Sequence, residues 1–261
     1  MKKNLIVLFS IVTMTAFVSC SDWAGDPITQ KFNIDGTYTE LEVEDAFDVV
    51  VSDTATMITI TAGENVMPKV RVVNNGDKLS IYLKGWASNR GKDMTVIIPY
   101  NPDLKSVNLS GASDFYSVFP LTGQNVEIEL SGSSDFYGDI EAEEVDMDLS
   151  GSSSVKGNVT ASELELDMSG ASDAMLTGQV STLKLGLSGA SSLKRSIVGS
   201  HYAFVCDNCE GSMSGSSDAY IHCDGSITVS LSGASDLYYT GSAVTRGSST
   251  SGSSNIVHDE L

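Results

Sequence analysis

A regular alternation of apolar and polar residues dominates the C-terminal part of the chain. Each unit contains a Ser-Gly-Ala/Ser-Ser phrase, and apolar residues usually stand two, four and six positions before its glycine, as Leu130, Ile128 and Val126 do. Polar residues such as Glu127 and Glu129 lie between them. An alternation with a period of two predicts β-strands that bury one side and expose the other.

The phrase recurs at a nearly constant spacing. Its glycines are Gly111, Gly132, Gly151, Gly170, Gly189, Gly215, Gly233 and Gly252, so successive glycines are 21, 19, 19, 19, 26, 18 and 19 residues apart. Such a unit cannot bury its own apolar side and must stack on its neighbours, whereas a propeller blade needs about twice this period. The repeat therefore predicts an all-β parallel β-helix with coils of about 19 residues, in which equivalent side chains align about 4.8 Å apart. Glycine at each corner predicts a positive φ there.

Residues 30–104 lack the phrase but keep the strand pattern. Phe47–Val51, Leu79–Leu83 and Met94–Ile98 read as strands, and Asn74–Asp77 predicts a turn. Because no linker follows, we expect one β-helix domain over residues 30–261, in which irregular N-terminal coils (30–104) cap the Ser-Gly repeats (105–256). The longest unit predicts a bulging loop near residues 194–202.

The N-terminus has the features of an export signal. Lys2 and Lys3 precede a short apolar run, which predicts a signal peptide over residues 1–19. Ser19-Cys20 resembles a bacterial lipobox, so we expect Cys20 to be lipidated and residues 20–29 to tether the domain to a membrane. Ordinary secretory cleavage nearby is the alternative. The last four residues, 258–261, spell an endoplasmic-reticulum retrieval signal, which we interpret as coincidental because such a protein does not need a cysteine at its cleavage point.

Charge and composition exclude several functions. The chain has 261 residues, with 15 Lys+Arg against 34 Asp+Glu and a formal net charge of -19. Nucleic acid is not an expected partner, because phosphate backbones require a basic surface. With 3 His and 4 Cys, the sequence predicts no cofactor, no metal site and no catalytic site.

The chemically most distinctive residues follow each Ser-Gly corner. Three residues after the glycine stand aspartates or serines, and two residues further stand tyrosines in four of the units. Strand parity places both sets on one outward face. Carboxylates beside aromatic rings suit sugars, so the candidate ligand-binding residues are Asp114, Tyr116, Asp135, Tyr137, Asp173, Asp218, Tyr220, Asp236 and Tyr238. The alternative is that the aspartates only close the turn and the tyrosines only stack.

Two further features concern cations and cysteines. Stacked carboxylates repel one another by roughly 1 kcal/mol at coil spacing, and calcium could bridge the adjacent pairs, but the Ser and Lys substitutions in two units already lower this repulsion. Cys206 and Cys223 stand nine and ten residues before their glycines, so neighbouring coils bring them together. We expect a Cys206–Cys223 disulfide in an oxidising envelope, with Cys209 free and buried.

These motifs together resemble one known family. The lipobox, Phe47–Val51, the Asn75-Gly76-Asp77 strand, the Ile97-Ile98-Pro99 corner and the repeated Leu-Ser-Gly-Ala-Ser-Asp resemble the GIN-domain family over roughly residues 30–256. That family is described as the head domain of autotransporter adhesins and is frequent in Bacteroidetes lipoproteins. The resemblance implies a right-handed β-helix and a bacterial envelope location. It implies no particular functional residues.

The sequence thus favours a noncatalytic lipoprotein of the outer membrane, facing the periplasm or the exterior. Its expected partners are the membrane, through the N-terminal lipid, and a glycan or another surface polymer. A polysaccharide-cleaving β-helix enzyme and a purely structural spacer are the alternatives, and fold analogy alone cannot choose between them. The sequence does not specify an oligomeric state.

Overall fold

The computed structural model describes residues 24–34, 36–85, 94–199 and 201–260. The expected signal peptide (1–19) and lipidation site Cys20 lie outside these residues. The chain is folded from the first described residue, because Ala24 is fully buried and its carbonyl accepts a hydrogen bond from the Asn65 N–H. The later part of the segment expected as a tether (20–29) therefore belongs to the folded body. Among the described residues, no helix has the length and apolar character needed to cross a membrane.

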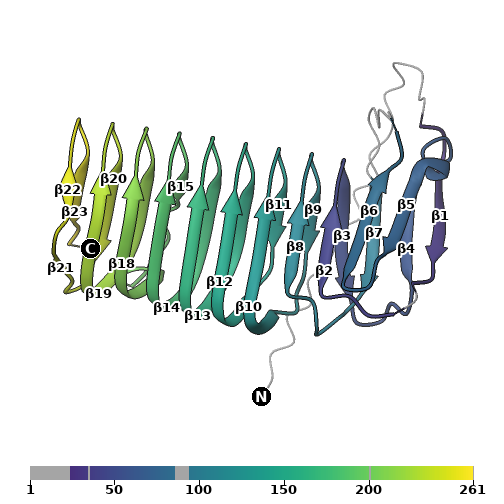
Figure 1. The fold of residues 1–261 in the computed structure, drawn as a ribbon, viewed down its shortest axis with the longest axis horizontal. Coiled ribbons are helices and arrows are strands. Elements are labelled where there is room, and N and C mark those ends of the chain that lie inside the picture. Colours follow the sequence, from purple (N-terminus) through teal and green to yellow (C-terminus); the bar gives the residue numbers. More distant parts are fainter. Residues whose placement is uncertain (1–23, 35, 86–93, 200, 261) are drawn as a thin grey trace.

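The fold is all-β, and its strands join into one elongated mixed sheet (Figure 1), apart from two short strands within residues 197–202 that form a separate two-stranded sheet. The N-terminal part contains β1 (Pro27–Phe32), β2 (Glu40–Val43), β3 (Phe47–Ser52), β4 (Ile58–Gly63), a short 3-10 helix (Met67–Lys69), β5 (Val70–Asn74), β6 (Lys78–Leu83) and β7 (Met94–Pro99). The first Ser-Gly units contain β8 (Ser106–Leu109), β9 (Asp114–Tyr116), β10 (Leu121–Leu130), β11 (Asp135–Tyr137), β12 (Ile140–Leu149), β13 (Ser154–Met168) and β14 (Asp173–Leu187). The remainder contains β15 (Ser192–Leu193), β16 (Ile197–Val198), β17 (His201–Tyr202), β18 (Phe204–Met213), β19 (Asp218–Leu231), β20 (Asp236–Thr240), β21 (Val244–Thr245), β22 (Ser249–Thr250) and β23 (Asn255–His258).

Successive Ser-Gly units pair in parallel, equivalent residue to equivalent residue. The apolar residue two positions before each glycine forms one such column: Leu109, Leu130, Leu149, Met168, Leu187, Met213, Leu231 and Thr250. Apart from Thr250 at its end, this column is buried. Each unit therefore forms one coil of a stack, and the column of identical positions supplies the core.

The N-terminal coils do not stack in chain order. β2 lies between β6 and β8, and β3 lies between β7 and β9, each in parallel pairing. The coil formed by β2 and β3 is therefore followed along the stack directly by the first Ser-Gly coil, while β6 and β7 lie outside it (Figure 1). Antiparallel pairs β1–β4, β4–β7 and β5–β6 complete this end. This arrangement gives the irregular N-terminal segment its capping position and makes the sheet mixed.

The Ser-Gly corner has the backbone geometry that the sequence predicts. The corner glycines all have φ between 75 and 80°. The serine two residues after the glycine is buried and closes the corner. In Ser172, for example, Oγ donates to the Ser169 carbonyl over 2.9 Å. The corners of neighbouring coils are joined as well, since the Ala171 N–H donates to the Gly151 carbonyl over 2.7 Å.

Two regions depart from the regular coil. The longest unit contains the expected insertion, which forms a short antiparallel hairpin of β16 and β17. At the C-terminal end, the last described coil places Thr245 against Ile227 and Thr250 against Leu231. Polar residues thus replace apolar ones at inward positions where the stack meets solvent, as in the terminal units of other repeat proteins.

Candidate functional site

One outward column of side chains runs along the whole stack, and we call it the Tyr row. Its members are Ile97, Val50, Tyr116, Tyr137, Lys156, Met175, Lys194, Tyr220, Tyr238 and Val257. Phe115 and Phe136, which precede two of the tyrosines, are fully buried. The alternation therefore turns the tyrosines outward, beside the column of aspartates two residues earlier.

The aspartates of this column form hydrogen bonds within the protein. One carboxylate oxygen of Asp114 accepts a hydrogen bond from the Tyr116 hydroxyl (3.1 Å), and the other accepts one from the Asp135 N–H (3.2 Å). Asp135 likewise accepts the Tyr137 hydroxyl and the Ser154 hydroxyl. These carboxylates thus hold neighbouring coils together and fix the tyrosine hydroxyls. Less of their hydrogen-bonding capacity remains for a ligand than the sequence suggests.

The tyrosines form two stacked pairs. The rings of Tyr116 and Tyr137 have centroids 4.8 Å apart and planes within 4°, and those of Tyr220 and Tyr238 have the same separation and planes within 6°. One face of each ring is therefore covered by its partner. The edges and the outer faces, next to Val50 and Lys156 in the first pair, are what a ligand could contact.

The coils between the two pairs carry a different set of side chains. Lys156 is exposed and lies in register between Tyr137 and Met175, which is 45% exposed. Lys194 forms an ion pair with Asp173, with 2.8 Å between Nζ and Oδ1. Candidate residue Asp173 is therefore neutralised by its neighbour and has no tyrosine in its own coil.

Sequence reasoning missed the N-terminal end of the row. Val50 and Ile97 lack the Ser-Gly signal, but the register places Val50 between Ile97 and Tyr116. Both side chains are more than a third exposed. The apolar residues of the Phe47–Val51 strand could have suggested this, because a strand with three successive valines must turn one of them outward.

Two of the carboxylates along this face, Asp114 and Asp218, have a raised pKa. Partial burial, helped by the charge of Asp135, raises the pKa of the Asp114 carboxyl against the opposing hydrogen bond from Tyr116. Partial burial and Asp236 similarly raise the pKa of Asp218. Burial, together with the adjacent aspartates, raises the pKa of all four tyrosines, so their hydroxyls stay protonated at neutral pH, and those of Tyr116, Tyr137 and Tyr238 donate to the aspartate of their own coil.

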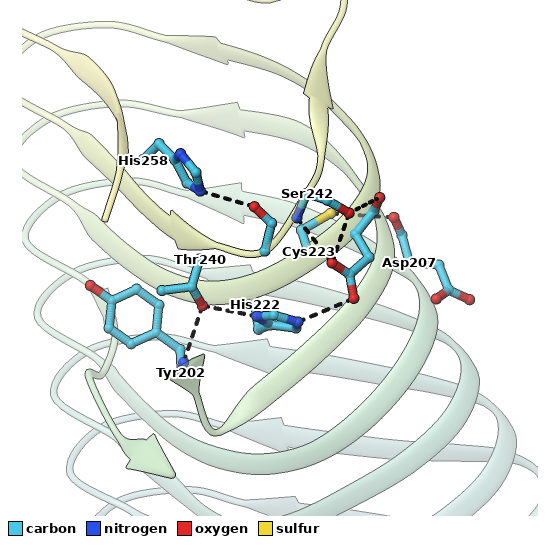
Figure 2. A network of polar contacts seen from close by, with 9 residues as sticks. Tyr202, Asp207, His222, Cys223, Thr240, Ser242 and His258 are labelled. Carbon is cyan, nitrogen blue, oxygen red and sulfur yellow. Dashed lines mark hydrogen bonds and ion pairs between the residues drawn. The ribbon is translucent and has the colours of Figure 1, made fainter. Parts of the chain in front are cut away.

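The hairpin insertion lies against the second tyrosine pair. Its Tyr202 is fully buried, meets the Tyr220 ring edge-on at 5.5 Å and bonds through its hydroxyl to Asp259. Its N–H donates to the Thr240 Oγ1 over 3.2 Å, as Figure 2 shows. Thr240 has an outward position in the strand, yet it is only 3% exposed. The hairpin thus covers the outer surface of β19 and β20.

The three histidines of the chain lie at this same corner. His222 contacts the Thr240 hydroxyl through Nδ1 (3.0 Å; Figure 2) and the Asp224 carboxylate through Nε2 (3.2 Å). Its ring centroid lies 4.9 Å from that of His201. Because the Asp224 carboxylate can only accept a hydrogen bond, its contact with Nε2 requires a proton on Nε2, and in neutral His222 the Nδ1 atom then accepts from the Thr240 hydroxyl. Thr240, whose hydroxyl links Tyr202 to His222 in this network, is buried beneath the hairpin. The network therefore holds the insertion against the stack.

The expected disulfide is not formed in the structure. Cys206, Cys209 and Cys223 are free, buried thiols. Cys206 and Cys223 are nevertheless direct register partners on β18 and β19, and the Cys223 thiol contacts the Asp207 carbonyl (Figure 2). Cys209 occupies a core position beside Ile227, and its burial raises the pKa of its thiol.

The opposite side of the stack is strongly acidic. Glu127, Asp146 and Glu165 form one column, and Glu129, Asp148 and Asp167 form the next. Partial burial, with the charges of the neighbouring carboxylates, raises the pKa of Asp146 and of Asp167. In the described part of the chain, no three His, Cys, Asp or Glu side chains are grouped to hold a metal ion.

Comparison with protein families gives one match. The profile described as "Putative auto-transporter adhesin, head GIN domain" matches residues 37–160 and 147–243. The matched segments include both tyrosine pairs and the hairpin. A comparison with curated proteins gives no match.

Several solved structures share the fold. A "putative adhesin" of Parabacteroides merdae is 19% identical, with a TM-score of 0.79 over 90% of this chain and 97% of that one. A "putative lipid binding protein" of Parabacteroides distasonis is 20% identical, with a TM-score of 0.74 over 90% and 98%. A "putative adhesin" of Bacteroides fragilis is 19% identical, with a TM-score of 0.64 over 90% and 97%. At these identities the likeness concerns the fold alone.

Proposed function

Because the chain belongs to the GIN-domain family of auto-transporter adhesin head domains, we propose that it is a noncatalytic adhesion module whose Tyr row binds a glycan or another surface polymer. An adhesin needs a surface rather than a reaction centre. The family assignment supports a surface or envelope role, and the geometry supports this particular face.

The exposed aromatic and aliphatic column carries the proposal. Tyr116 is 37% exposed, whereas Phe115 directly before it is fully buried. Internal hydrogen bonds and ring stacking hold the tyrosines in place before any ligand arrives, so little side-chain entropy is lost on binding. Amphipathic rings with fixed hydroxyls suit the mixed polar and apolar faces of sugars.

The enzyme alternative has less support. A polysaccharide-cleaving β-helix places an acid and a base on either side of a scissile bond, whereas the carboxylates of the Asp/Tyr face are tied to tyrosine hydroxyls and backbone N–H groups. A purely structural spacer would explain the stack of coils, but it gives no role to the outward column of tyrosines.

Location and winding complete the proposal. Lipidation of Cys20 would anchor the chain in the outer membrane, facing the periplasm or the exterior. Cys20 lies four positions before the buried Ala24, a reach of at most about 14 Å, so the folded body would lie close to that membrane. We take the coils to wind as a right-handed parallel β-helix, because crossovers between parallel strands are almost always right-handed.

Polysaccharide binding tests the function. The native chain is applied to immobilised β-glucan, xylan and mannan. A variant in which Tyr116, Tyr137, Tyr220 and Tyr238 are replaced by Ala is tested in the same way. We expect saturable binding by the native chain, loss in the variant, and no shortening of the polymers in chromatography of the supernatant. Equal binding by both proteins would refute the assignment to the Tyr row, and release of short products would favour an enzyme.

Lipid is a second candidate ligand, favoured by one observation. Val118, two residues beyond Tyr116, is 87% exposed, and Val50 and Ile97 are exposed in the adjoining coils. A related structure is called a lipid binding protein. Flotation of the chain with phosphatidylethanolamine vesicles, compared with a Val118→Ser variant, would detect this binding.

A further inference from the structure

We infer that only the N-terminal half of the Tyr row binds the polymer, from Ile97 to Met175, and that this stretch takes an uncharged, extended chain. The hairpin of β16 and β17 ends the site. This inference rests on the proposed function, because it divides the same row into a binding part and a structural part.

The first reason is what the hairpin covers. Tyr202 packs on Tyr220, the Tyr202 N–H bonds to Thr240, and Arg195 lies 5.9 Å above the Tyr202 ring. The second tyrosine pair is thus a platform that holds the insertion. The first tyrosine pair, Tyr116–Tyr137, has no such cover among the described residues.

The second reason is exposure. The N-terminal half presents Ile97 and Val50 (37% and 38% exposed), Tyr116 (37%) and Met175 (45%). Tyr137 in this half is only partly exposed, as are Tyr220, Tyr238 and Val257 in the C-terminal half. The first half therefore presents more exposed apolar or aromatic side chains, although the exposed Lys156 lies among them between Tyr137 and Met175.

The third reason concerns charge and length. Five coil spacings separate Ile97 from Met175, which is about 24 Å. Asp48, Asp114, Asp135 and Asp173 flank this stretch in the neighbouring column. Among the described residues of the row, Lys156 and Lys194 oppose them. An acidic polymer is repelled there, and an uncharged one is not.

Two double variants separate the halves of the row. Tyr116→Ala/Tyr137→Ala and Tyr220→Ala/Tyr238→Ala are compared on the immobilised β-glucan, xylan and mannan used above, with alginate as the acidic comparator. We expect the first pair to weaken binding roughly tenfold or more, because two aromatic contacts are lost, and the second to leave affinity within about threefold. Alginate should bind less than the uncharged polymers, most clearly at low salt.

A second set of variants covers the case in which a tyrosine variant fails to fold. Met175→Glu introduces a charge in the binding half, and Val244→Glu does so at another exposed apolar position, outside the row. Weaker binding by Met175→Glu alone supports the inference. Equal loss in both tyrosine pairs, preference for alginate, or unchanged binding by Met175→Glu overturns it while the function stands. If neither tyrosine pair affects binding, the proposed function itself falls.

Discussion

Replacing a corner glycine by alanine probes the stack most directly. An added Cβ at Gly170 would lie 2.4 Å from the Gly151 carbonyl oxygen in the neighbouring coil, closer than Cβ atoms and oxygens approach. That carbonyl cannot withdraw freely, because it accepts the Ala171 N–H over 2.7 Å. The column of glycines is therefore required by the contact between coils as well as by the backbone angle.

The chain contains a matched control for the backbone angle. Gly76, in the turn between β5 and β6, has φ +79°, and a Cβ there would meet nothing within 4 Å. Gly76→Ala should cost only the left-handed conformation of alanine, about 1–2 kcal/mol. Gly170→Ala should cost this and a further 1–3 kcal/mol or so for the clash. The entropy that alanine removes from the unfolded chain is common to both variants.

Thermal unfolding followed by far-ultraviolet circular dichroism measures the difference. At roughly 2–4 °C per kcal/mol for a chain of this size, Gly76→Ala should lower the Tm by roughly 2–8 °C and Gly170→Ala by roughly 4–20 °C. Calorimetry of the same samples would reveal a split transition if the clash divides the stack into two cooperative parts. Equal losses in the two variants would refute close contact between corners, and with it the alignment on which the Tyr row depends.

Two other properties are open to measurement. Burial and neighbouring carboxylates raise the pKa of Asp146 and Asp167 above the ordinary 3.8, so their contribution to stability is complete below pH 3.8 and is lost as the pH rises through the raised values. As the pH falls toward 3.8, the Tm should therefore rise, and Asp146→Asn should flatten this dependence; an unchanged slope would contradict the assignment. Oxidation of the chain by oxidised glutathione should join Cys206 to Cys223, because register partners on parallel strands have the Cα spacing of a disulfide. Peptide mapping without reductant would detect the bond. If oxidised samples that were unfolded and refolded still contain both cysteines as unmodified thiols, the prediction is contradicted.

The regular part of the molecule could be predicted because its physics is local and repeated. A two-residue alternation gives the buried side, and a glycine of positive φ gives the corner. A period near 19 then leaves stacking as the way to cover the apolar column. For the same reason the outward position of Tyr116 beside Asp114 followed from parity. The N-terminal coils lack this redundancy: nothing in Glu40–Val43 indicates that it pairs with both Lys78–Leu83 and Ser106–Leu109.

The candidate site shows where such reasoning ends. The repeat predicts that Tyr116 and Tyr220 are equivalent, because both follow the same Ser-Gly phrase and both stack on a tyrosine of the next coil. The difference between them comes from an insertion outside the repeat, whose Tyr202 reaches a neighbouring coil through the Thr240 hydroxyl. A long-range contact of this kind leaves no periodic trace in the sequence. In a stacked fold the repeat therefore predicts which column faces outward, whereas the breaks in the repeat decide which part of that column a ligand can reach.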